Sequence, residues 1–242
     1  MSLQKKCMKA VVKVNLLIFV LPLLLMSACS NDTSKVSSES SNLEGFTFFN
    51  LGSDSLLSDQ VRNNLEDHLG SEAITRQTTL DLSIHTSDFL KEYFPYLEGL
   101  NKKLNWPPRE RVEHNITKLM YRYAVKNELP FKYVELFFSN YSGKPLFFRI
   151  YASSKGDSTI EALKKKYGTP KEILWSDNNF KTLFWQKQKD VLTASLTQNR
   201  YDRSEYLFCI FYVKNLENLV GLEKIEQKAK EEKIEDAGKT AF

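Results

Sequence analysis

The chain has 242 residues, with 34 basic and 30 acidic side chains and a formal charge of +4. Residues 1–28 contain four of the lysines and no acidic residue, so residues 29–242 carry 30 charges of each sign. A chain without net charge has no long-range attraction to a phosphate backbone, and we expect no nucleic-acid partner. Its length is sufficient for one substantial hydrophobic core or two small ones.

The N-terminal residues have the pattern of a secretory signal. Lysines at positions 5, 6, 9 and 13 precede an apolar run from Leu16 to Leu25, and small residues follow this run. One alternative is a transmembrane helix, but the apolar run is short for one. The other is a signal peptide that is cleaved without lipidation.

The residues Met-Ser-Ala-Cys at positions 26–29 resemble the lipobox of bacterial lipoproteins. The resemblance implies that residues 1–28 are a signal peptide and that the chain is cut just before Cys29. It also implies that the Cys29 thiol is diacylglycerylated, which makes this residue the membrane anchor. In the enterobacterial sorting pattern an Asp at the next position holds a lipoprotein at the inner membrane, so Ser30 favours the periplasmic face of the outer membrane.

The rest of the chain divides by composition. Residues 30–44 are polar and rich in serine, which predicts a flexible tether. The lipidated Cys29 and this tether together form segment 29–44. Residues 45–222 have the patterns of a globular domain. Residues 223–242 alternate Lys and Glu at helical spacing, which predicts a charged helix or tail.

Cysteine use excludes an intramolecular disulfide in the mature chain. Cys7 leaves with the signal and Cys29 takes the lipid, so Cys209 is the cysteine that remains. Because Cys209 lies within the apolar sequence Tyr-Leu-Phe-Cys-Ile-Phe-Tyr-Val, we expect a buried, unreactive thiol.

Within the globular part, hydrophobic periodicity predicts helices and strands in an order that we give by residue range. The first half contains a helix from 57 that ends at Gly70, a strand over 74–84, a helix from 86 that Pro95 kinks or splits, and strands over 118–125, 131–139 and 144–152. The second half contains a helix from 157 to Gly168, strands over 172–175, 182–186, 191–197 and 206–213, and a last helix from 216.

This order predicts an α+β fold, an antiparallel sheet with helices packed on one face. Residues 86–152 and 158–213 each contain one helix followed by strands, which is compatible with a tandem αβββ duplication. The helix that Gly168 and Pro170 end, together with Trp175 and the strands that follow, resembles envelope lipoproteins of the SmpA/OmlA type. Those are helix-plus-three-strand domains that accompany the outer-membrane barrel assembly machinery. This chain departs from them in length, and we carry over no functional residue.

No motif for catalysis or cofactor binding is present in the sequence. It contains no nucleophile elbow, no zinc-protease motif, no phosphate-binding loop and no Cys-x-x-Cys pair. His68, His85 and His114 are not at metal-ligand spacing, so surface histidines are the expectation. We therefore expect no catalytic residue, metal or cofactor. An enzyme would require His85 or His114 to meet carboxylates in a cleft.

One face of the predicted sheet mixes aromatic and charged side chains. In strands 131–139 and 144–152 one alternating set is apolar, whereas the other contains Tyr133, Phe137, Phe147, Arg149 and Tyr151. Tyr and Arg are enriched at binding interfaces, so these five residues are the predicted partner-binding surface. The alternative is that another part of the chain covers them.

These features predict a lipid-anchored envelope lipoprotein that acts without catalysis. Its membrane contact is the lipid on Cys29, and its partner is another envelope protein that it helps to assemble, scaffold or inhibit. The alternative is a small apolar or amphipathic ligand bound between sheet and helices, in a pocket lined by Phe94, Leu97, Phe148 and Trp185.

Overall fold

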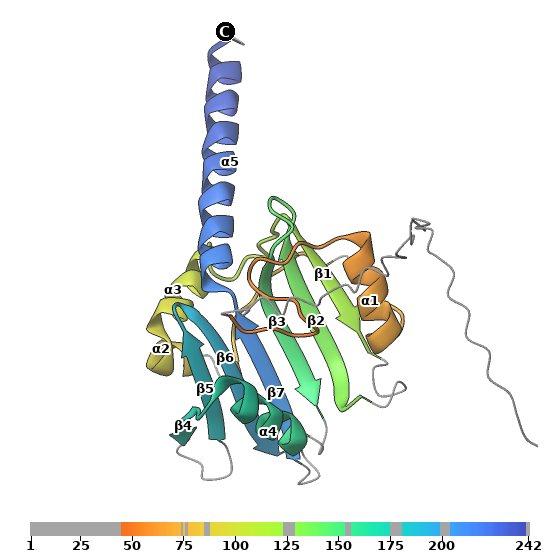
Figure 1. The fold of residues 1–242 in the computed structure, drawn as a ribbon. Helices are drawn as coiled ribbons and strands as arrows, with labels where there is room; N and C mark the ends of the chain where they lie inside the picture. The colour runs from red at the N-terminus through yellow and green to blue at the C-terminus, as the bar shows by residue number, and fades with distance from the viewer. Residues whose placement is uncertain are drawn as a thin grey trace, which may run out of the picture. The chain divides into compact units, whose positions relative to one another are not determined.

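A computed structural model of the chain describes residues 45–73, 75, 77–84, 88–122, 129–152, 156–174, 181–198 and 204–240. The predicted signal peptide, Cys29, the tether and Trp175 lie outside these residues. Helices and strands alternate much as the periodicity predicts (Figure 1). In chain order they are α1 (Asp59–Leu69), α2 (Phe89–Tyr93), α3 (Pro95–Leu104), β1 (Ile116–Tyr121), β2 (Phe131–Ser139), β3 (Pro145–Ala152), α4 (Gly156–Tyr167), β4 (Lys171–Leu174), β5 (Lys181–Lys187), β6 (Asp190–Gln198), β7 (Ser204–Phe211) and α5 (Val213–Thr240).

The seven strands form one antiparallel sheet with the order β1-β2-β3-β7-β6-β5-β4. Two meanders, β1-β2-β3 and β4-β5-β6-β7, meet where β3 pairs with β7. The pairing runs from Phe147 opposite Phe211 to Ala152 opposite Tyr206. The predicted α+β class with an antiparallel sheet is confirmed.

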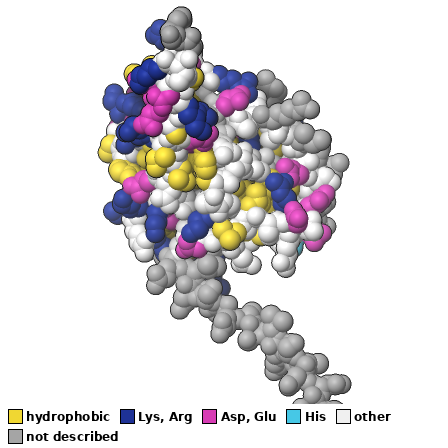
Figure 2. Space-filling view, turned by 90° about the horizontal axis from the view of Figure 1, so that it is seen from above, with side chains coloured by type: hydrophobic (Ala, Val, Ile, Leu, Met, Phe, Trp, Pro, Cys, Tyr) yellow, Lys and Arg dark blue, Asp and Glu magenta, His cyan; other side chains and the backbone are white. Residues whose placement is uncertain are grey.

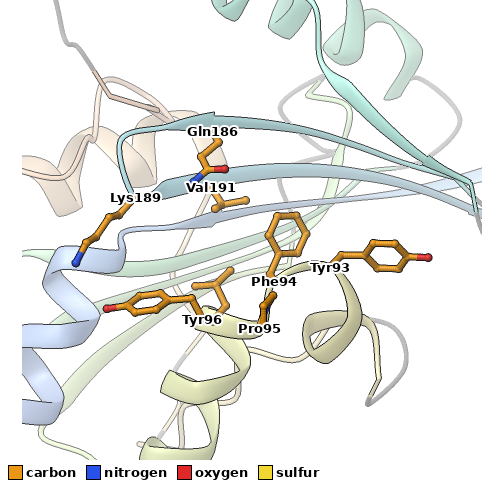
Figure 3. A pocket seen from close by; sticks show the side chains of 8 residues that line it. Tyr93, Phe94, Pro95, Tyr96, Gln186, Lys189 and Val191 are labelled. Carbon is orange, nitrogen blue, oxygen red and sulfur yellow. The ribbon is translucent and has the colours of Figure 1, made fainter.

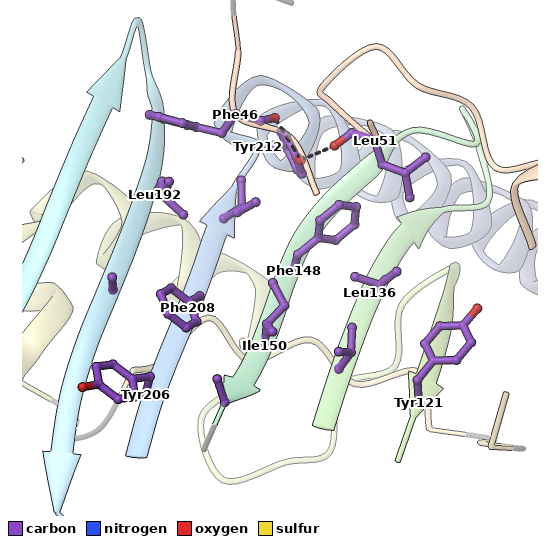
Figure 4. Close-up of a cluster of buried hydrophobic side chains, with 14 of the residues drawn as sticks. Phe46, Leu51, Tyr121, Leu136, Phe148, Ile150, Leu192, Tyr206, Phe208 and Tyr212 are labelled. Carbon is purple, nitrogen blue, oxygen red and sulfur yellow. Dashed lines mark hydrogen bonds between the residues drawn. The ribbon is translucent and has the colours of Figure 1, made fainter. Parts of the chain in front are cut away.

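One face of the sheet forms a core with α1, α4 and the segment 46–51 (Figure 4). The apolar set of β2 and β3 lies here, as the alternation predicts, except Leu146, which packs in the other core; Phe148 and Phe208 are buried in this one. Phe46 is fully buried as well. The Tyr212 hydroxyl donates to the main-chain oxygen of Leu51 at 3.0 Å and also lies 3.3 Å from that of Phe46, which ties the segment 46–51 to the sheet.

The opposite face forms a second core with α2, α3, the start of α5 and the extended segment 80–84. Its centre is a stack of rings, with Phe137 and Phe147 centroids 5.7 Å apart and Phe147 and Phe211 centroids 4.8 Å apart. The expectation that helices cover one face is therefore corrected, because helices pack against both.

The proposed duplication matches the strands but not the helices. The last strands of the two meanders, β3 and β7, pair antiparallel. If the two halves were repeats, a twofold axis perpendicular to the sheet would relate them. Rotation about that axis leaves a helix on the same face of the sheet. However, α4 packs in the first core, whereas α2 and α3 pack in the second. Helix 86–104 is thus not the counterpart of α4, and the repeats as we drew them do not superpose.

The segment predicted as a strand over 74–84 is not a strand in the residues described. Leu80, Leu82 and Ile84 are each fully buried, which explains the alternating pattern. Its backbone, however, bonds to other partners: the Leu82 N–H donates to Asn101 Oδ1 at 2.9 Å, and the Thr78 carbonyl accepts from the His114 N–H at 3.1 Å. The segment is an extended strap across the second core.

Helix α5 begins in the second core, where Leu216 and Leu219 are buried, and continues away from the sheet (Figure 1). Its outer part carries ion pairs between side chains four residues apart, such as Glu226 with Lys230 at 2.7 Å and Glu235 with Lys239 at 2.7 Å. Such pairs support an exposed helix. Within the described residues, no helix combines the length and apolarity that crossing a bilayer requires.

Candidate functional site

The predicted partner-binding surface on β2 and β3 is largely buried. Phe137 is 2% exposed and Phe147 is fully buried under the ring stack of the second core. Tyr133, Arg149 and Tyr151 are partly buried. The expectation of an exposed aromatic face is therefore wrong, and the alternative that other parts of the chain cover it holds.

The charges on this face are buried because they pair with one another. Glu135 lies opposite Arg149 in the ladder, and its carboxylate contacts both the Lys118 ammonium and, at 3.3 Å, Arg149 Nη1. The Tyr133 hydroxyl donates to Glu135 Oε1 at 2.7 Å. Arg149 also donates to the main-chain oxygen of Asp81 at 2.8 Å, so the cluster fastens the strap to the sheet.

The same contacts set the protonation state of Glu135. Burial acts to raise the pKa of this carboxyl, but hydrogen bonds from Lys118 and Tyr133 and the charges of Lys118 and Arg149 outweigh it and lower the pKa. The cations also lie over rings, with Lys118 5.2 Å from the Phe137 centroid and Arg149 5.0 Å from that of Phe147. This arrangement holds β1, β2, β3 and the strap together, with both cations in contact with the same carboxylate.

A cleft between α2–α3 and the β5–β6 hairpin offers a different site (Figure 3). We name it the tyrosine cleft; it encloses about 300 Å³ and is lined by Tyr93, Phe94, Pro95, Tyr96, Leu97, Gln186, Lys189 and Val191. It lies where Pro95 splits the predicted helix, because Phe94 leaves helical geometry with φ −136° and ψ 62°.

The break in the helix separates the rings of the cleft. Phe94 points toward the strands and meets the Phe184 ring edge-on at 5.2 Å, whereas Tyr93 and Tyr96 point away on either side (Figure 3). Tyr93 is 37% exposed and Tyr96 is 51% exposed. An apolar floor between two exposed phenols suits a compact apolar group that carries a polar atom.

Polar side chains close one end of the tyrosine cleft. The Lys189 ammonium lies 2.8 Å from Glu217 Oε1 and 5.4 Å from the Tyr96 ring centroid. The Tyr96 hydroxyl donates to the same Glu217 oxygen. Helix α5, which carries Glu217, is thereby linked to the rim of the cleft.

Two of the four residues predicted to line a ligand pocket, Phe94 and Leu97, do line this cleft. Phe148 and Trp185 belong to the other core, on the far side of the sheet. The aromatic residues on both sides of Pro95 are a local sequence signal for this cleft. Lys189 comes from a hairpin far along the chain and had no such signal.

His114 meets a carboxylate, as an enzyme would have required. Its Nδ1 lies 2.8 Å from Glu223 Oε2, beside a cleft of about 570 Å³ between α3 and α5. The residues that line that cleft in the described part of the chain include no Ser, Thr or Cys, so the pair does not form a Ser–His or Cys–His arrangement. His85 lies outside the described residues, and His68 stands in the last turn of α1.

The remaining expectations concern cysteine and metal. Cys209 is fully buried, as predicted, and burial raises the pKa of its thiol to about 12. Among the residues that the structure describes, no three His, Cys, Asp or Glu side chains are grouped so that they could hold a metal ion.

Comparison with protein-family models, with curated proteins and with solved structures finds no match to this chain. Its function is therefore argued from its own residues.

Proposed function

We propose that this protein is a lipid-anchored lipoprotein of the bacterial cell envelope that acts by binding rather than by catalysis. The anchor is supported by the N-terminal lysines, the short apolar run and the position of Cys29. Two or three acyl chains, at about 0.8 kcal/mol per buried CH₂, hold a protein on a bilayer almost permanently. Ser30 favours the outer membrane.

Metabolic labelling with a palmitate analogue tests the anchor. The wild-type protein should take up the label and fractionate with membranes, and Cys29→Ser should lose both properties. Cys209→Ala is the matched control and should keep the label, because Cys209 is buried. Labelling that persists in Cys29→Ser would contradict the proposal.

For the binding activity, the geometry favours a small apolar or amphipathic ligand in the tyrosine cleft. The observation that carries this proposal is the cavity of about 300 Å³ between helices and sheet, which is at the lower end of ligand-pocket sizes. Its floor is apolar, and Lys189 with Glu217 provides a polar end. The sheet-face hypothesis is not retained, because Phe137 and Phe147 are buried.

Titration with N-phenyl-1-naphthylamine, a neutral apolar dye that fluoresces in apolar sites, tests the tyrosine cleft. Tyr93→Ala removes one wall and should weaken dye binding about fivefold, which is the size of one lost aromatic contact. Tyr141→Ala is the control, because Tyr141 is also 37% exposed but lies elsewhere. Equal affinities for the two variants would refute the assignment.

A second candidate, protein contact through α5, is favoured by the apolar side chains on its outer part. Leu222, Ile225 and Ile234 are 40%, 68% and 72% exposed. Photocrosslinking in cells from position 225, matched with position 174, tests it, since Leu174 on β4 is 71% exposed. A recurrent partner captured from 225 and not from 174 would support this candidate, and identical patterns would contradict it.

A further inference from the structure

A second, larger cleft lies where the C-terminal end of α3, the loop 105–115 and α5 come together. We name it the lysine cleft, since Lys102, Lys103 and Lys224 line it, and it encloses about 570 Å³. Figure 2 shows the interspersed positive, negative and hydrophobic side chains on one face of the molecule. The lysine cleft is separate from the tyrosine cleft, and the inference below does not depend on the activity proposed for that site.

Two of the lysines that line the lysine cleft have no ion-pair partner among the residues that the structure describes. Lys102 pairs with Glu98 at 3.4 Å, but Lys103 and Lys224 have no carboxylate within 4.0 Å in the part of the chain that the structure describes. Two cations close together without a counterion favour an anionic ligand.

Glu223, which also lines the cleft, forms no ion pair with Lys103 or Lys224 among the described residues, and both of its oxygens contact other groups. Its Oε2 lies 2.8 Å from His114 Nδ1, and its Oε1 accepts a hydrogen bond from the Asn115 N–H at 3.1 Å. Both oxygens therefore serve to hold the loop 105–115 to α5.

His114 adds an unsatisfied polar atom at the wall of the cleft. Its side chain is 2% exposed, and its Nε2 is buried without a hydrogen-bond partner among the described residues. A buried polar atom without a partner is unfavourable, and a ligand group beside it can remove that cost. Because Glu223 holds Nδ1, Nε2 is the ring nitrogen that is left to meet a polar group.

Apolar groups complete the lysine cleft. The Trp106 side chain is 70% exposed at its edge, which is unusual for the largest apolar residue, and Leu104, Val112 and Val220 form a wall. An exposed indole beside cations offers a flat surface to an apolar ligand body.

From these contacts we propose that the lysine cleft binds a small amphipathic anion: a carboxylate, sulfonate or phosphate group attached to an apolar body. The acidic group lies between Lys103 and Lys224, and the apolar body lies on Trp106.

The test compares two dyes of similar ring structure, 1-anilinonaphthalene-8-sulfonate, which is anionic, and N-phenyl-1-naphthylamine, which is neutral. The protein is the chain from residue 29 made without lipid, which keeps every residue of both cores. Trp106→Ala and Lys224→Gln should each weaken binding of the anionic dye about threefold to fivefold, as expected for one aromatic or one exposed ionic contact.

Matched variants keep this test specific. Leu174→Ala controls for loss of an exposed apolar side chain, and Lys228→Gln controls for loss of a lysine one turn further along α5; neither should change the affinity. Tyr93→Ala should weaken the neutral dye and leave the anionic dye unchanged, so failure at one cleft is distinguishable from failure at the other. The inference is overturned if Trp106→Ala and Lys224→Gln leave the affinity for the anionic dye unchanged. It is also overturned if these variants weaken binding of the neutral dye by the same factor.

Competition identifies the source of the anion. Displacement of the anionic dye by free decanoate supports a soluble fatty anion. Displacement by phosphatidylglycerol vesicles but not by decanoate or phosphatidylcholine vesicles supports an anionic lipid headgroup. If none of these displaces the dye, the proposed ligand class is wrong.

Discussion

Replacing Glu135 by Gln removes the charge at the centre of the buried ion cluster while keeping the size and shape of the side chain. Glu135 is 5% exposed, and the side chains of its partners Lys118 and Arg149 are 9% and 18% exposed. Both cations would stay in place without their carboxylate. Removing one member of a buried ion pair costs about 3–5 kcal/mol, so we expect the free energy of unfolding to fall by about that amount.

Urea unfolding at pH 7, followed by circular dichroism, measures this loss. Lys118→Met in combination with Glu135→Gln should cost at least about 1 kcal/mol less than the sum of the single variants, because the double variant leaves no unpaired lysine. A loss below about 1 kcal/mol for Glu135→Gln would refute the reasoning, since the cluster would then be exposed to water or weakly coupled.

The same variant should change how stability depends on pH. The pKa of Glu135 is lowered in the folded state, so its contribution is complete above the pKa of the unfolded chain and is lost as pH falls through the folded value. The wild type and Glu135→Gln should therefore converge in stability in acid and diverge toward neutral pH. Parallel curves would contradict this assignment.

Three further variants and one reagent probe the two cores. Gly156→Ala should lower the free energy of unfolding by about 1–3 kcal/mol, because a Cβ there would lie 2.1 Å from the Tyr206 ring. Gly99→Ala is the control: its Cβ would meet nothing within 4 Å, so it should leave stability unchanged or raise it. Thermal unfolding measures both. Tyr212→Phe should lose about 1–2 kcal/mol in urea unfolding, because the main-chain oxygens of Phe46 and Leu51 lose the hydroxyl and Leu51 keeps the Phe48 N–H as a donor; unchanged stability would show that water replaces the hydroxyl. A thiol reagent at pH 8 should modify Cys209 only in urea, because the folded thiol is buried and its pKa is raised to about 12.

The strands could be predicted because alternation along each is strong. The bounds of β2 match the prediction, and those of the other strands differ by a few residues at most, since strand ends depend on pairing with a neighbour. The segment 77–84 shows the limit of the method. Its alternating burial looks like a strand in the sequence, although its backbone bonds to a helix side chain and a loop and not to a neighbouring strand.

Exposure of the candidate sites could not be predicted, because it depends on contacts distant in sequence. Lys118 contributes the second cation to the Glu135 cluster from another strand, so the sequences of β2 and β3 alone do not show how the charges of the mixed face are paired when buried. His114 and Glu223 are 109 positions apart, and no local pattern in the sequence indicates their pairing. By contrast, the division of the helix at Pro95 is local and was predicted, and this break forms the tyrosine cleft.

The segment 46–51 has a mechanical consequence for a protein anchored at Cys29. The described chain begins at Gly45, and the next residue, Phe46, is already fully buried beside Tyr212. Under the anchoring proposed at Cys29, tension from the lipid would reach Phe46 before any other residue of the two cores. Removing the Phe46 ring from its site would open the first core beside β7. A force on the anchor would therefore disrupt the core of the domain before its outer helices.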